Sequence, residues 1–323
     1  MQESAHSGLP QTFLSPKRSS PAAVDESARY AKIGVTPPPK ADNRTRFKSF
    51  VDRINRRQWE LLGDVVHGKL GYNKEHLSLY EFTASLKNEF APKTNITLDI
   101  VTSLGGDDDA AAATDGPVMA RLRVKTLVTE GPCLPSAARK HSEYARHMVA
   151  HFADTKISHL YDISDVDEKQ SLSQRVVPLP GPRSPPALPE TPVDLRRFYA
   201  DYIACINDGR IAEDLHRFCR PSGVVWNGTH YTVQQYGEMI QSSREAISGL
   251  FFDIHTLVVD GSRQQLAARL EFTGTPVKPF AGAVPNGRPV AFAEHVFYWL
   301  EEGKISDVLT IVDWEDYRSQ LAR

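Results

Sequence analysis

Two residues that could transfer a proton, His147 and Asp162, lie 15 positions apart in the segment ARHMVAHFADTKISHLYDISD, Ala145 to Asp165. A carboxylate can remove a proton from a carbon atom beside a carbonyl group, and a nearby imidazole can orient the substrate or lower the pKa of the carboxyl. This chemistry requires that both side chains converge in apolar surroundings. Whether they do so depends on the strands that carry them.

The segment predicts two antiparallel strands joined by a two-residue turn at Asp154-Thr155. If Ala153 faces Lys156, then His147 faces Asp162 with their Cβ atoms about 5 Å apart. The rest of the His147 face would be Ala145, Val149 and His151, which is mainly apolar, as in a pocket wall. A slip of one residue would put Asp162 on the opposite face. The alternative interpretation is a cross-strand pair on a solvated surface.

The same segment recurs 148 residues later as AEHVFYWLEEGKISDVLTIVD, Ala293 to Asp313, with 7 of 21 positions identical. His295 repeats His147, but Thr310 stands where the first copy has Asp162. A threonine hydroxyl cannot replace a carboxylate base near neutral pH. The comparison favours the first copy as the one that keeps the chemistry, with the second copy kept for shape; the alternative is a working site in the second copy.

The elements around these segments also occur twice. Amphipathic helices are expected at 46–62 and 194–218, and further helices at 75–90 and 232–247. Runs rich in β-branched residues predict four strands in each copy: 95–104, 118–128, 144–152 and 157–164, then 251–261, 265–276, 290–300 and 305–313. Helices followed by antiparallel strands, found twice, predict an α+β fold in which a whole domain is duplicated.

This pattern resembles the SnoaL-like polyketide cyclases of the cone-shaped superfamily that includes ketosteroid isomerase and scytalone dehydratase. The residues that carry the resemblance are RFYADYIACINDGRIAEDLHRF and GRPVAFAEHVFYWLEEGKISDVLTIVDWEDYRSQL in the second copy. It covers about 47–168 and 195–320. The resemblance implies two tandem cones, each with N-terminal helices packed on a curved antiparallel sheet.

The resemblance further implies that Asp162 is the general acid/base and that His147 is its partner. The substrate-binding positions that it implies are His295, Trp226, Asn227, His67 and Tyr72. The implied function is a cofactor-independent cyclase, isomerase or dehydratase that acts on a hydrophobic, polyketide-like molecule of secondary metabolism. The alternative, which Thr310 and the long N-terminal tail favour, is a non-catalytic small-molecule-binding or scaffold protein. Superfamily members often pair through their open sheets, so domain pairing within the chain or a homodimer is expected.

Composition sets the domain organisation. The chain has 323 residues, 41% of them hydrophobic, and a formal net charge of −2, which argues against nucleic-acid or membrane partners. Residues 1–42 are expected to form a disordered tail, and 171–192 a proline-rich linker, with seven prolines in 176–192. The globular blocks would be 43–170 and 193–323. Three cysteines and an N-terminus without an apolar signal segment favour a soluble, cytoplasmic protein.

No metal or cofactor is expected. His147 and His151 have the spacing of a helical zinc motif, but in a strand they would lie about 13 Å apart. The acidic run Asp107–Asp109 lacks the alternating ligand spacing of a calcium loop. The sequence also contains no glycine-rich phosphate loop and no nucleophile elbow.

Overall fold

The computed structural model describes residues 42–91, 96–105, 116–128, 140–165, 189 and 193–322. All of these residues fall within one compact unit. The predicted tail, apart from Asp42, and most of the predicted linker lie outside the described residues. The boundaries of the two domains therefore stay predictions.

The described chain contains two six-stranded sheets with the same topology. The first has the order β2-β1-β6-β5-β4-β3 and the second the order β8-β7-β12-β11-β10-β9. In each, one pair is parallel, β1 with β6 and β7 with β12, and the other pairs are antiparallel. The strands of the first sheet are β1 Val66–Tyr72, β2 Glu75–Ser78, β3 Thr97–Gly105, β4 Val118–Val128, β5 Lys140–Ala153 and β6 Lys156–Ser164. Those of the second are β7 Val224–Trp226, β8 Thr229–Tyr231, β9 Ile247–Asp260, β10 Gln265–Pro276, β11 Val290–Glu301 and β12 Lys304–Val312. The duplicated α+β fold is confirmed.

Most of the described α-helices begin at a side-chain cap, and a capping box occurs in both domains. The α-helices are α2 Asn43–Asn55, α3 Leu79–Glu89, α5 Leu195–Asn207, α6 Ile211–Asp214, α7 Val233–Ala246 and α8 Trp314–Leu321, and short 3₁₀ helices are Trp59–Asp64 and Leu215–Arg217. A capping box starts α3, where Ser78 and Glu81 bond each other's backbone N–H, and a second one starts α7. In α7 the same roles fall to Thr232 and Gln235.

Each opening helix is fastened to its sheet by one asparagine. The Asn55 side chain donates to the carbonyl of Leu98 at 2.8 Å and accepts from the Leu98 N–H at 2.9 Å. Asn207 makes the same two bonds with Phe252, both at 2.9 Å. The repeated Ile-Asn pair is therefore a structural anchor between helix and strand.

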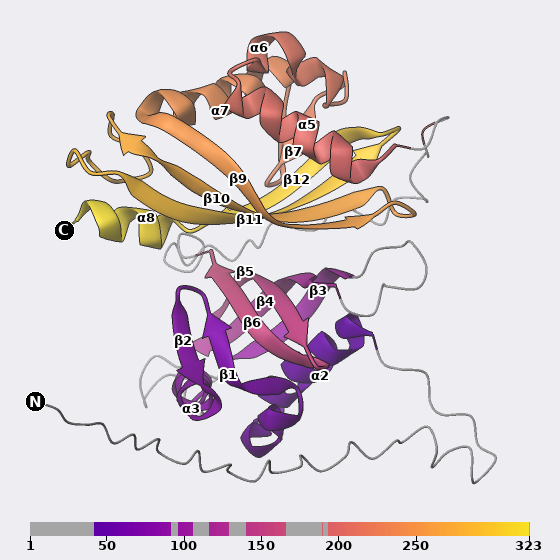
Figure 1. Ribbon diagram of the computed structural model, residues 1–323, viewed down its shortest axis with the longest axis vertical. Helices are drawn as coiled ribbons and strands as arrows, with labels where there is room; N and C mark the ends of the chain where they lie inside the picture. The colour runs from indigo at the N-terminus through magenta and orange to yellow at the C-terminus, as the bar shows by residue number, and fades with distance from the viewer. Residues whose placement is uncertain are drawn as a thin grey trace, which may run out of the picture. The chain divides into compact units, whose positions relative to one another are not determined.

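Each sheet has its own apolar core on the side that its helices cover. Figure 1 shows α5, α6 and α7 on one side of the second sheet. Fully buried aromatic residues fill both cores: Phe47, Phe50, Phe82 and Phe90 in the first domain, and Tyr199, Tyr202 and Tyr317 in the second. The opposite face of each sheet therefore remains for other contacts.

The sequence analysis found four strands in each domain and missed β1, β2, β7 and β8. It also assigned 75–78 to a helix, whereas Glu75–Ser78 is a strand. These strands have three to seven residues. Such short segments do not display a clear alternation of apolar and polar residues, and pairing with a neighbouring strand decides their conformation.

Candidate functional site

The predicted pairing of His147 with Asp162 is wrong by one residue. The turn forms as expected, with Asp154 and Thr155 both at positive φ, and Ala153 pairs with Lys156. Beyond the turn, however, His147 pairs with Ile163, and Asp162 pairs with Met148. Because side chains alternate between faces, His147 and Asp162 lie on opposite sides of the sheet.

A β-bulge causes this shift, and it occurs in both domains. Pairing moves by one residue between His151 and Phe152, which leaves Ser158 as the extra residue on β6. The hydroxyl of Ser158 donates to the His151 carbonyl at 3.3 Å, and Ser306 does the same to the Trp299 carbonyl at 3.0 Å. The repeated Lys-Ile-Ser sequence thus encodes a bulge that sets which side chains face the interior.

His147 and His295 lie where the two sheets face each other and are fully buried. The Nδ1–H of His147 donates to the backbone carbonyl of His295 at 2.9 Å, and the Nδ1–H of His295 donates to that of His147 at 3.1 Å. Arg121 donates to Nε2 of His147 at 2.7 Å, and Arg269 to Nε2 of His295 at 3.0 Å. The two histidines form a reciprocal contact, as the self-complementary interface of a symmetric dimer would.

The electrostatics of this contact keep both histidines neutral. Burial, followed by the positive charge of Arg121, holds the pKa of His147 well below its ordinary value. Burial and Arg269 do the same for the pKa of His295. Nδ1 carries the proton because it faces a carbonyl, and Nε2 accepts from the arginine. The structure thus gives the repeated histidine a role in joining the sheets.

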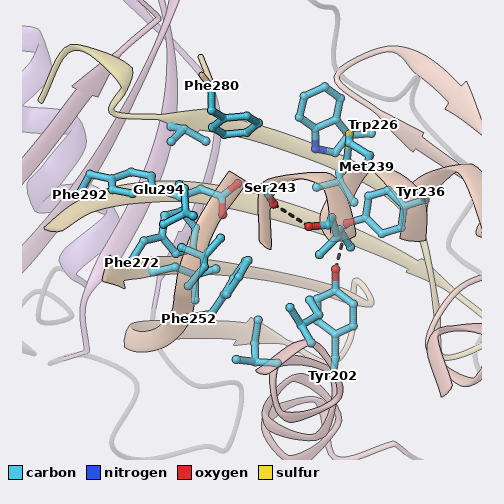
Figure 2. A pocket seen from close by; sticks show the side chains of 18 of the residues that line it. Tyr202, Trp226, Tyr236, Met239, Ser243, Phe252, Phe272, Phe280, Phe292 and Glu294 are labelled. Carbon is cyan, nitrogen blue, oxygen red and sulfur yellow. Dashed lines mark hydrogen bonds between the residues drawn. The ribbon is translucent and has the colours of Figure 1, made fainter. Parts of the chain in front are cut away.

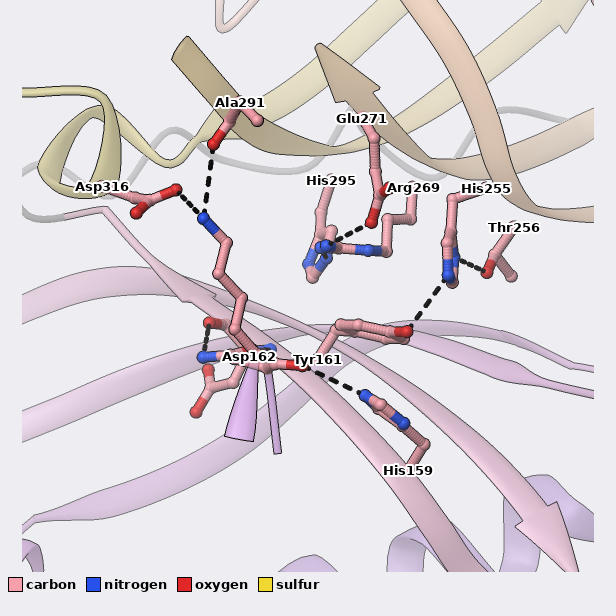
Figure 3. Close-up of polar contacts among 12 residues, drawn as sticks. His159, Tyr161, Asp162, His255, Thr256, Arg269, Glu271, Ala291, His295 and Asp316 are labelled. Atoms are coloured by element: carbon pink, nitrogen blue, oxygen red, sulfur yellow. Dashed lines mark hydrogen bonds and ion pairs between the residues drawn. The ribbon is translucent and has the colours of Figure 1, made fainter. Parts of the chain in front are cut away.

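Other side chains extend the contact between the sheets (Figure 3). The hydroxyl of Tyr161 lies 3.1 Å from Nε2 of His255, and the Arg269 guanidinium stacks 4.0 Å from the centre of the Tyr161 ring. Lys74 donates to Asp316 at 2.6 Å at the edge of the contact. The apolar part consists of Leu104, Met119, Val149, Val258, Ala267, Phe297 and Leu309, with Ala145, Ile163, Ala293 and Ile311 beside them.

Replacing either histidine should destabilise the protein by the same amount. His147→Ala and His295→Ala each remove a buried ring and two hydrogen bonds, at a cost of about 2–4 kcal/mol in the free energy of unfolding. The double variant should lose about the sum of the two, because each ring bonds to the backbone carbonyl of the other residue, which alanine retains. Urea denaturation of the wild type and the three variants measures these losses. Losses below about 0.5 kcal/mol for the single variants would contradict the reciprocal contact.

Asp162 faces the interior of the first domain, where it forms an ion pair with Arg146. Arg146 donates from Nε to Asp162 at 2.7 Å and from Nη2 to the other carboxylate oxygen, and it also donates to Glu89 at 2.6 Å. The Tyr72 hydroxyl donates to Asp162 at 2.8 Å. The Arg146 and Asp162 side chains are each only 4% exposed. This carboxylate is therefore engaged by three donors of its own domain.

The second domain holds a cavity of about 180 Å³ among its helices and strands. Its walls are almost entirely apolar and rich in aromatic rings: Tyr202, Trp226, Tyr236, Phe252, Phe272, Phe280, Phe292, Tyr298 and Trp314. Two of the polar groups, the hydroxyls of Tyr202 and Tyr236, hydrogen bond each other at 2.9 Å. A chamber of this kind suits a hydrophobic, ring-containing molecule.

Glu294 brings a carboxyl group into this cavity (Figure 2). Burial in apolar surroundings raises its pKa to about 7, and a hydrogen bond from the Thr310 hydroxyl partly opposes this rise. Among the described residues that line the cavity, Glu294 is the one acidic residue, and none is Lys, Arg or His. A carboxyl that titrates near neutral pH beside an apolar chamber can act as a general acid or base.

The interiors of the two domains differ in charge at equivalent positions. Arg146 and Asp162 of the first domain correspond to Glu294 and Thr310 of the second, at the same offset of 148 as the two histidines. Asn73 and Asn227 also correspond. The Asn73 side chain hydrogen bonds to the backbone N–H and carbonyl of Asp162, and the Asn227 side chain makes the same two bonds with Thr310. The first domain has filled this place with an ion pair, whereas the second has kept a carboxyl facing a cavity.

The residues that the sequence predicted to bind substrate lie in different parts of the structure. Trp226 lines the cavity. The Asn227 side chain is occupied by the Thr310 backbone, and Tyr72 by Asp162. His67 is on β1, half-buried, and its ring contacts the Ala153 carbonyl at the hairpin turn at 2.7 Å. His295 belongs to the contact between the sheets.

The sequence analysis did not select Glu294, although it lies beside His295. An isolated strand cannot show which of two neighbours faces the core. The sequence did contain one indication: the residue directly before the repeated histidine is Arg146 in the first domain and Glu294 in the second. This difference can be interpreted only when the position of the serine bulge is known.

Within the described ranges, no cluster of three or more His, Cys, Asp or Glu side chains is arranged to hold a metal ion. Among the helices that the structure describes, none is both long and apolar enough to cross a bilayer.

The fold and the cavity together define a class: a cone-shaped α+β domain with a buried carboxyl in an apolar chamber. Residues 194–321 match the family model described as SnoaL-like polyketide cyclase. The second domain belongs to this family, and the first repeats its topology in tandem. No curated protein matches the chain.

Solved structures with similarity to the chain include a SnoaL-like polyketide cyclase from Agrobacterium tumefaciens. It is 34% identical, covers 39% of this chain and 97% of its own, and has a TM-score of 0.37. IdmH, a putative polyketide cyclase from Streptomyces antibioticus, is 20% identical over 41% of this chain and 100% of its own, with a TM-score of 0.37. AclR, a putative hydroxylase from Streptomyces galilaeus, is 12% identical over 41% of this chain and 98% of its own, with a TM-score of 0.36.

Proposed function

We propose that the protein is a cyclase or isomerase that needs no cofactor and works in the cavity of the second domain, with Glu294 as the proton carrier. The observation that carries this proposal is the buried carboxyl on the cavity wall, whose pKa is raised to about 7. A base is most effective when its pKa lies near the working pH. The proposal moves the site from Asp162, the residue predicted from the sequence, to the other domain.

In the proposed reaction, the Glu294 carboxylate removes a proton from a carbon beside a carbonyl group. The products of this step are an enolate and a neutral carboxylic acid. In an isomerase the acid returns the proton to a different atom of the same molecule. In a cyclase the enolate carbon attacks a second carbonyl of the chain, and the proton goes to the resulting alkoxide. The Thr310 hydroxyl, which donates to Glu294, would fix the orientation of the carboxyl.

The walls favour a neutral, hydrophobic substrate with at least one ring. Aromatic rings line the cavity, and none of the lining residues that the structure describes is cationic and able to balance an anion. The family suggests a polyketide-derived molecule. An acidic ligand would meet the Glu294 carboxylate without compensation.

For the first domain we propose a structural role. Its equivalent site is filled by the ion pair of Arg146 and Asp162, and its open sheet face contacts that of the second domain through the reciprocal histidines. The first domain would then take the place that a second subunit has in a homodimer. A non-catalytic role for this half of the chain agrees with part of the alternative that the sequence left open.

Proton exchange on a simple ketone tests the function without knowledge of the natural substrate. The methyl protons of 4-fluoroacetophenone lie beside a carbonyl, and their replacement by deuterium in heavy water is followed by NMR. The wild-type protein should accelerate this exchange over buffer, and Asp162→Asn should leave the acceleration unchanged while the protein stays folded, as circular dichroism would verify. If Asp162→Asn abolished exchange in a folded protein, the site would lie in the first domain.

A further inference from the structure

Three neighbouring strands in the first domain bring three side chains together. Tyr72 on β1, Asp162 on β6 and Arg146 on β5 form one network, in which Tyr72 and Arg146 donate to Asp162 at 2.8 and 2.7 Å. A residue at the Tyr72 position can thus place a hydrogen-bond donor beside the residues at the Arg146 and Asp162 positions.

Trp226 occupies this position in the second domain. It pairs with Val308 on β12 as Tyr72 pairs with Leu160 on β6. The next residue is asparagine in both domains, at φ 49° and 45°, and is held by the same backbone bonds. The backbone that carries the Trp226 ring is therefore fixed in the same way.

The indole N–H of Trp226 has lost the acceptor that its counterpart uses. Thr310 stands in place of Asp162, and its hydroxyl donates to Glu294. In the part of the chain that the structure describes, the Trp226 N–H makes no hydrogen bond, while its ring packs edge-on against Tyr231. Figure 2 shows the indole nitrogen on the ring edge turned toward the other lining side chains. A donor and a carboxyl thus border the same cavity.

We propose that the Trp226 N–H donates the hydrogen bond that holds the carbonyl oxygen of the substrate. The arrangement places a donor for the oxygen on β7 and a base for the neighbouring carbon on β11, the two strands on either side of β12. When the base removes the proton, negative charge develops on that oxygen, and a fixed donor in an apolar site stabilises it. The catalytic part of this inference rests on the proposed function, whereas the binding part does not.

A pair of probes isolates this hydrogen bond. 4-Fluoroacetophenone has a carbonyl, and 1-ethyl-4-fluorobenzene has nearly the same shape without one; fluorine NMR gives the Kd of each. Trp226→Phe keeps an aromatic ring but removes the N–H. We expect it to weaken ketone binding about 3- to 10-fold relative to hydrocarbon binding, with the hydrocarbon Kd changed less than about twofold. Tyr72→Phe, the matched change in the first domain, should alter neither Kd.

The outcomes separate this inference from the proposed function. If Trp226→Phe weakens both probes equally or leaves their ratio unchanged, the ring only packs, and the inference fails. An unchanged ratio in Trp226→Phe together with a loss of ketone preference in Tyr236→Phe would assign the donor to the tyrosine pair instead. If the Trp226 result holds but Glu294→Gln leaves ketone exchange intact, the donor stands and the proton carrier is wrong. Failure of the ketone to bind the wild type would overturn both.

Discussion

Glu294→Gln is expected to lower the exchange of the 4-fluoroacetophenone methyl protons by two to four orders of magnitude. Glutamine keeps the size of the side chain and can still accept from Thr310, but it cannot take up a proton near neutral pH. The same experiment on Glu302→Gln, at the exposed turn of the same hairpin, provides the control and should show no loss. Exchange that persists in Glu294→Gln would rule out this carboxyl as the base.

The same substitution should stabilise the protein above pH 7. The pKa of Glu294 rises on folding from its ordinary 4.5 to about 7, because burial penalises the carboxylate. A group whose pKa is raised by folding contributes stability at low pH and loses it as the pH rises through the folded value. At pH 8 the wild type therefore carries a penalty of about 3 kcal/mol that the glutamine variant lacks. Urea denaturation at pH 5 and pH 8 measures this difference. A variant less stable than the wild type at pH 8 would contradict it.

Arg146→Met is expected to lower the free energy of unfolding by about 3–5 kcal/mol. The substitution leaves the Asp162 carboxylate buried without its cationic partner, and both side chains are only 4% exposed. Loss of the whole ion pair should cost much less, because neither buried charge remains and the other partner of Arg146, Glu89, is 34% exposed. Arg146→Met with Asp162→Leu should thus recover most of the loss in urea denaturation. A cost below about 1 kcal/mol for Arg146→Met alone would show that the pair is not buried as described.

The repeat made the domain architecture predictable. Identical residues at a constant offset of 148 predicted a duplicated domain. The periodicity of apolar residues predicted the helices and the long strands. The turn at Asp154 and Thr155 also formed as predicted. These features depend on local sequence, which is why one chain sufficed to find them.

The candidate site was not predictable in the same way, because one extra residue in β6 and in β12 determines which side chains face the interior. Ser158 and Ser306 form bulges whose bonds to the facing strand exist only after the hairpin has formed. Without the bulge His147 would face Asp162; with it, Asp162 and Thr310 lie on the same face as Arg146 and Glu294, opposite the two histidines. The choice between adjacent side chains is thus made by pairing rather than by residue type.

The titration of the Glu294 side chain tests the central claim most directly. Protein labelled with carbon-13 at the glutamate carboxyl carbon would be titrated by NMR, and the Glu294 signal would be assigned by its absence from Glu294→Gln. We predict that this signal titrates near pH 7, as a proton carrier in an apolar cavity requires. A midpoint near the ordinary value of 4.5 would mean that the carboxyl is solvated, and would contradict the account.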